Sequence, residues 1–223
     1  MTHYVRGVPR PPSSPPDGLY PLIPQSLLEA IRNLDTPLDD GLNELAGEMV
    51  AKRLGLSQTV ALQIERYHDS VVHKHLVPVE EVILIFRLVG RRSDAAMVFA
   101  DAGRRAARYA VRSAGAATRL LLRAVPVPLR RGSGRQAAAR AARRVLRIPL
   151  ELTSGEGHPA ARVSDSLATQ AGYPGTGCAF YSAALAELLR VTSGFEGAMV
   201  HELCRGRGDP YCSWRAAEPG GYE

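Results

Sequence analysis

The chain has 223 residues, of which 45% are hydrophobic and 22% charged, and its formal net charge is +6. That length and apolar fraction fit one domain with a buried core and an extension. No run approaches the roughly 18 apolar residues of a membrane span, and the N-terminus lacks a secretory signal's apolar segment, so we expect a cytoplasmic protein with no membrane span.

Proline dominates the beginning of the chain. Residues 1–19 carry five prolines between positions 9 and 16. Because proline fixes φ and removes a backbone donor, we expect a disordered or extended arm there. An N-terminal helix is expected within 20–40, over residues 24–34, where leucine and isoleucine recur at helical spacing. A ligand-binding domain then spans 41–217, ahead of a short tail at 218–223.

Helical periodicity continues into the domain. Apolar spacing predicts helices over 41–55 and after Ser57, which is a suitable N-cap. Residues 79–89 are apolar enough for a buried helix or a strand. Glu80 and Glu81 favour the helix, because carboxylates stabilise the first turn.

The rest of the chain alternates helices, loops and short strands. Helices are expected over 93–113, 135–147 and 178–191, a Pro/Gly loop over 126–134, and strands over 160–164, 198–203 and 211–216. The last two strands form a hairpin. These elements predict an α/β (α+β) fold, helix-rich, with a small antiparallel sheet that ends in a C-terminal hairpin.

Arginine dominates the middle of the domain. No acidic residue occurs between Ala102 and Leu150, whereas thirteen arginines lie from Arg104 to Arg147. Such a segment is either a solvated helical face or a site for an acidic or phosphate-bearing partner, such as nucleic acid, a nucleotide-tailed substrate or an acidic carrier protein. Both interpretations stay open.

The three cysteines are gathered beside a histidine in the last fifth of the chain. Cys178 begins a predicted helix, His201 and Cys204 end one hairpin strand, and Cys212 begins its partner. In a reducing compartment this grouping favours a metal over disulfides. Thiolates with an imidazole are typical zinc ligands, and four protein ligands leave no open position, which predicts a structural zinc. The alternative is three buried, inert cysteines.

The cysteine spacing resembles a known family, the vinyl-reductase-type small-molecule-binding domain. This domain is the sensor of bacterial phenol- and xylene-responsive activators, occurs in a bacteriochlorophyll biosynthesis protein, and shares its fold with subunits of the TRAPP tethering complex. The resemblance covers about residues 160–216 and includes the turn at 206–209 and Trp214 after the last cysteine. The family's acidic ligand position falls on His201, a departure that still supplies a ligand.

The resemblance implies a TRAPP-subunit-like fold, a homodimer, and an enclosed apolar pocket beside the zinc for a hydrophobic, often aromatic, small molecule. Polar and aromatic candidates for the pocket wall are His158, Tyr173, Tyr181 and Trp214. We therefore expect a zinc-stabilised binding or sensor module. No catalytic order of residues stands out.

Two other functions remain open at this point. The bacteriochlorophyll relative motivates a specialised-metabolism enzyme, a reductase, cyclase or isomerase that acts on an apolar or carrier-bound substrate in the same pocket. In that case His158 or Tyr181 would do acid–base work. A weaker alternative is a DNA-binding regulator, since residues 48–60 partly match a helix-turn-helix. The following segment, 58–70, lacks a basic recognition surface.

Overall fold

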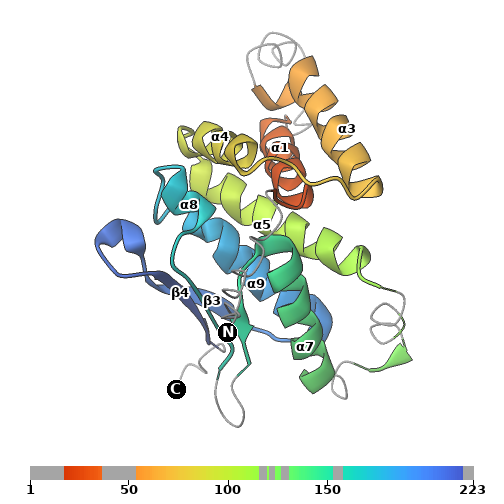
Figure 1. Ribbon diagram of the computed structural model, residues 1–223, viewed down its shortest axis with the longest axis vertical. Coiled ribbons are helices and arrows are strands. Elements are labelled where there is room, and N and C mark those ends of the chain that lie inside the picture. Colours follow the sequence, from red (N-terminus) through yellow and green to blue (C-terminus); the bar gives the residue numbers. More distant parts are fainter. Residues whose placement is uncertain are drawn as a thin grey trace, which may run out of the picture.

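The computed structural model describes residues 18–36, 54–115, 120, 124–126, 131–152 and 158–217. Its helix-rich architecture with one four-stranded antiparallel sheet confirms the predicted fold class (Figure 1). The predicted helix over 41–55 lies outside the described residues except for its last two positions, and so do residues 1–17 of the arm and the whole tail.

The elements follow the predicted order with a few additions. The helices are α1 (Leu22–Asp35), α3 (Gln58–Val72), α4 (Val79–Gly90), α5 (Ala95–Arg112), α7 (Arg131–Ala141), α8 (Leu167–Gln170) and α9 (Cys178–Ser193). Shorter turns are η1 (Leu54–Leu56), the π-helical η3 (Ala142–Leu146) and η4 (Arg205–Arg207). The strands are β1 (Leu150–Glu151), β2 (Ala160–Val163), β3 (Ala198–Leu203) and β4 (Cys212–Ala217). Residues 79–89 are thus helical, and Ser57 caps α3 by accepting from the Val60 amide.

Helix α7 corrects the sequence prediction, because it begins inside the expected loop at 126–134. Gly132 and Gly134 are therefore helical, although glycine costs about 1 kcal/mol relative to alanine in a helix. Close packing explains Gly134: a Cβ atom there would lie 2.2 Å from the Thr192 carbonyl oxygen of α9. Contact between the two helices thus overrides local propensity.

The end of the predicted arm belongs to the fold. Gly18 and Leu19 are buried, and Leu19 exchanges backbone hydrogen bonds of 2.8 and 3.0 Å with Val77. The helix that follows, α1, contributes fully buried side chains to the same core as the rest of the described chain, namely Ile23, Leu27 and Ile31. The boundary of any extended arm therefore lies before residue 18.

The helices cover one face of the sheet, whose strand order is β1-β2-β4-β3 (Figure 1). The register places Leu150, Ala161 and Trp214 side by side on this face, where all three are buried. The opposite face carries charged side chains, including Arg215, which donates to Glu202 over 2.8 Å. One face of the sheet is therefore core and the other is surface.

The core is built around the crossing of α5 and α9. Gly103 makes this crossing possible, because a Cβ atom there would lie 2.2 Å from the Phe180 carbonyl oxygen. From this crossing a row of aromatic rings reaches the sheet: the ring centroids of Phe180 and Tyr181 are 5.3 Å apart, and those of Tyr181 and Trp214 are 5.4 Å apart. The aromatic core therefore extends to the hairpin.

No described helix has the length and apolar character needed to cross a membrane.

Candidate metal centre

Four side chains predicted from sequence converge at one point. The ligand atoms of Cys178, His201, Cys204 and Cys212 all lie within 4.8 Å of one another. Around a tetrahedral zinc with Zn–S bonds near 2.3 Å, sulfur atoms lie about 3.8 Å apart, so this spacing fits a shared ion. The cysteines are fully buried and the histidine is partly buried. The cluster joins the start of α9 to both strands of the hairpin.

The hairpin turn is organised around Cys204. The Asp209 carboxylate accepts a 2.7 Å hydrogen bond from the Cys204 amide, and the Cys204 carbonyl accepts from the Arg207 amide at 2.8 Å. Gly208 closes the turn with a φ of 95°, a conformation that side-chain-bearing residues rarely adopt. The turn thereby fixes the backbone on which the Cys204 thiol is mounted.

A β-bulge brings His201 and Cys204 to the same side. In a regular strand, residues three apart point to opposite faces. Here the pairing shifts between His201, opposite Trp214, and Leu203, opposite Ser213, which inserts one extra residue into β3. Glu202 lies between the two ligand residues and accepts a 2.8 Å hydrogen bond from Arg215 on the outer face of the sheet.

The loop before α9 delivers Cys178 to the hairpin. Gly206 in the turn packs so tightly on this loop that a Cβ atom would lie 1.9 Å from the Pro174 side chain. Gly177 is similarly close to Ala168, at 2.7 Å. Cys178 is then the first residue of α9, where the helix N-terminus favours a thiolate.

The protonation chemistry of the cluster is governed by burial. Burial is the main cause that raises the pKa of the Cys178 thiol to about 12, and the neighbouring Cys212 and Cys204 act in the same direction. Burial, assisted by the charge of Arg207, lowers the pKa of His201, so its imidazole is neutral at pH 7. Neutral imidazole is the metal-binding form, and a bound cation would stabilise thiolates that burial alone disfavours.

A buried nitrogen without a hydrogen-bond partner also supports a bound metal ion. The His201 Nε2 atom is buried and has no hydrogen-bond partner in the described part of the protein. Buried polar atoms without partners are uncommon and costly. A metal ion held by the three thiols would provide the missing partner. The donor set and the geometry therefore both suit a metal with four protein ligands.

The predicted pocket residues do not gather in one described cavity. Tyr181 is buried, and its hydroxyl accepts a 3.1 Å hydrogen bond from the Leu167 amide. Trp214 stacks on His201 with ring centroids 5.1 Å apart. Tyr173 packs against Gly90 of α4, and His158 is exposed just before β2. A hollow of about 90 Å³ is partly lined by Trp214 but by none of the other three. The ligand pocket stays a prediction.

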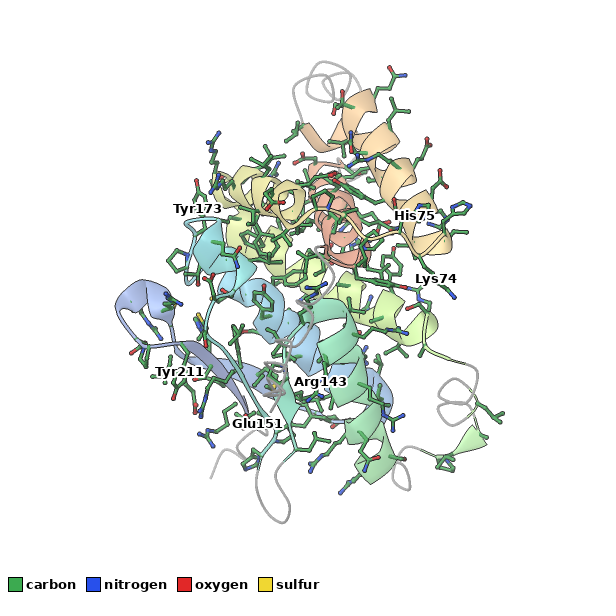
Figure 2. The ribbon with its side chains drawn as sticks, in the orientation of Figure 1. Lys74, His75, Arg143, Glu151, Tyr173 and Tyr211 are labelled. Carbon is green, nitrogen blue, oxygen red and sulfur yellow. The ribbon has the colours of Figure 1, made fainter. Side chains whose placement is uncertain are left out.

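Histidines elsewhere in the described chain do not join the cluster. His73 and His75 stack on each other, with centroids 5.8 Å apart, at the end of α3. Figure 2 places Lys74 and His75 far from the β3–β4 hairpin. The groups that could hold a metal among the described residues are thus those of the hairpin cluster.

Searches with this chain found no matching family model, no similar curated protein and no similar solved structure.

Proposed function

We propose that this protein is a zinc-stabilised binding or sensor module for a hydrophobic, aromatic-type small molecule, working as a homodimer in the cytoplasm. The observation that carries the proposal is the closed cluster of Cys178, His201, Cys204 and Cys212. Three soft sulfur donors and one imidazole in a compact set are the ligands that zinc prefers over hard cations.

A closed ligand set favours a structural role for the metal. Catalytic zinc keeps a coordination position for water, whereas four protein ligands leave none. The ion would join α9 to the hairpin and hold Trp214 and the aromatic core in place. Chemistry or ligand binding would then belong to the surrounding protein rather than to the ion.

The ligand class rests on the resemblance to the vinyl-reductase-type domain. A sheet with helices on one face and a cysteine cluster at its last hairpin is compatible with that resemblance. The enzyme alternative keeps the same pocket but requires that the bound molecule be transformed. The buried, backbone-bonded hydroxyl of Tyr181 is poorly suited to proton transfer, which favours the binding module over the enzyme.

Native mass spectrometry of the purified full chain tests the metal and the ligand together. We expect one zinc per chain, a dimer mass, and a retained small molecule that is recovered unchanged after incubation. A retained molecule that is converted to a product would favour the enzyme. A metal-free protein whose thermal stability does not respond to a chelator would refute the structural zinc.

A matched pair of hairpin variants makes the metal assignment specific. Cys212→Ser removes one sulfur ligand and is expected to abolish stoichiometric zinc. Ser213→Ala changes the next residue, whose side chain does not belong to the cluster, and is expected to retain one zinc per chain. Equal zinc content in the two variants would place the metal elsewhere.

A further inference from the structure

The outer side of α7 carries positive charge that the described protein does not neutralise. Arg140 lies at the C-terminal end of α7, and Arg143 and Arg144 lie in η3, which follows it directly. None of the ion pairs among the described residues uses any of them. By contrast, Arg105 and Arg108 of α5 pair with Asp101 and Glu187.

One of the three arginines is held in place, whereas the other two are available. Arg144 donates 3.1 Å hydrogen bonds to the Ala110 carbonyl and to the Ser113 hydroxyl. Arg140 and Arg143 have no hydrogen-bond or ionic partner in the described chain. The surface thus combines one oriented guanidinium with two whose donors are unused.

Two hollows meet at Arg140. The larger, of about 290 Å³, lies between α7 and β1 and is lined by Arg140 and Arg143 together with Ala139, Leu150 and Leu152. The smaller, of about 240 Å³, is lined by Arg140 and Arg144 beside alanines of α7 and Ala114, which follows α5. Figure 2 shows Arg143 on the side of α7 near β1. Each hollow therefore has both guanidinium and apolar walls.

The backbone is irregular at the same place. Residues Ala142–Leu146 form a π-helical turn, and Arg147 after it has a left-handed φ of 54°. The π-helical turn ends the helix, and Arg147 takes the left-handed conformation that commonly terminates helices. The turn sets the positions of Arg143 and Arg144 relative to Arg140.

We propose that the hollow between α7 and β1 binds a small amphiphile with a phosphate head and a short apolar segment. Guanidinium forks bind phosphate oxygens in pairs, and the dianion relieves repulsion between Arg140 and Arg143, which line this hollow. Leu150 and Leu152 then contact the apolar segment. The volume is near the lower end of the roughly 300–1,000 Å³ of ligand pockets, so the ligand is small.

Nucleic acid fits these walls less well. Single-stranded nucleic acid needs aromatic rings on which bases stack. The hollow has none, and Tyr109, on the neighbouring α5, is already covered by the Arg112 guanidinium, 4.9 Å from its ring. The apolar wall formed by the two leucines has no role in binding a phosphate backbone.

Isothermal titration calorimetry of the full metal-loaded protein with hexyl phosphate tests this site. We expect one site per chain, with affinity at least about tenfold above that for inorganic phosphate, because the alkyl chain buries apolar surface. Arg140→Gln and Arg143→Gln should each weaken hexyl phosphate about tenfold through lost guanidinium contacts. Leu152→Asn should weaken hexyl phosphate while leaving inorganic phosphate unchanged.

Arg104→Gln is the matched control, because Arg104 is exposed on α5, forms no ion pair with the described residues and does not line the hollow. Arg104→Gln should alter the affinity for hexyl phosphate less than about twofold. If it weakens binding as much as Arg140→Gln does, the attraction is diffuse and the site is overturned. The site would also be overturned by inorganic phosphate binding as tightly as hexyl phosphate, by no binding of either, or by displacement of hexyl phosphate by a mixed-sequence oligonucleotide at lower concentration.

This site goes beyond the proposed function and does not depend on it. Zinc content and the retained apolar molecule are measured without hexyl phosphate. Loss of the phosphate site in Arg143→Gln would leave both unchanged, so the two proposals fail separately.

Discussion

At the scale of single residues, Tyr181 connects the metal cluster to the aromatic core. Its ring contacts Phe180 on one side and Trp214 on the other. Its hydroxyl satisfies the Leu167 amide at the start of α8. Burial raises the pKa of this hydroxyl above its ordinary range, so it stays protonated at neutral pH. The side chain therefore has a structural role in the described fold.

Removal of the Tyr181 hydroxyl should lower the free energy of unfolding. Tyr181→Phe leaves the buried Leu167 amide without a partner, which is expected to destabilise the protein by about 1–3 kcal/mol in urea unfolding. Tyr211→Phe is the control, because its hydroxyl makes no hydrogen bond to the described residues, and its effect should stay within about 0.5 kcal/mol. Equal effects of the two variants would contradict this role of Tyr181.

At the scale of elements, glycines determine how closely the helices approach. Gly134 of α7 faces α9, and a Cβ atom there would overlap the Thr192 carbonyl. Gly132, two residues earlier in the same helix, has open space around it. The two positions share a helix but differ in what surrounds them, so they separate packing from helix propensity.

Substitution by alanine should therefore have opposite effects at these positions. Gly134→Ala forces the helices apart and is expected to cost about 1–3 kcal/mol or more. Gly132→Ala should stabilise the protein by about 0.5–1 kcal/mol through better helix propensity. Thermal unfolding of both variants provides the comparison. The same sign in both would mean that α7 does not pack on α9 through Gly134.

An ion pair network joins α5 to α9 and makes that contact sensitive to pH. The Glu187 carboxylate is 5% exposed and accepts from Arg190 at 2.7 Å and from Arg108 at 2.6 Å. The hydrogen bond from Arg190, with help from Arg108, lowers the pKa of Glu187 from 4.5 to about 2. The carboxylate therefore contributes stability that is fully present above its unfolded pKa and is lost as pH falls toward its folded pKa.

Glu187→Gln should remove this contribution. We expect wild type to be more stable than the variant by about 1–3 kcal/mol at pH 7, since the half-exposed arginines weaken the pairing. The difference should shrink as pH falls from about 5 to 2. Urea unfolding of both proteins at each pH cancels effects of acid on the metal cluster. A difference that is constant with pH would contradict the lowered pKa.

At the scale of the whole molecule, long periodic elements could be predicted and close contacts could not. Helical spacing located 178–191, and alternating residues located the final hairpin. The helical start at Arg131 was missed, because it depends on contact with α9. The grouping of three cysteines with His201 in the sequence predicts the four residues of the cluster. The bulge that brings His201 and Cys204 to the same side leaves no mark in the amino-acid composition. Two ligands three residues apart on one strand nevertheless require such an irregularity.

Removal of the metal should change the surroundings of Trp214 and lower the thermal stability of the protein. Trp214 is the single tryptophan and stacks on His201, so its fluorescence reports on the cluster. We expect a zinc chelator to shift its emission to longer wavelength and to lower the thermal midpoint, as water reaches the indole. Cys212→Ser should resemble the chelated wild type and should not respond further to chelator. An unchanged emission spectrum after complete metal removal would contradict this dependence of the core on the metal.

The coordination of the metal is the central claim, and X-ray absorption at the zinc edge of the purified full chain measures it directly. Cys178, Cys204, Cys212 and His201 predict three sulfur ligands near 2.3 Å and one nitrogen near ~2.0 Å, with no water. A first shell made of oxygen and nitrogen alone, or one sulfur with several waters, would contradict the closed structural site.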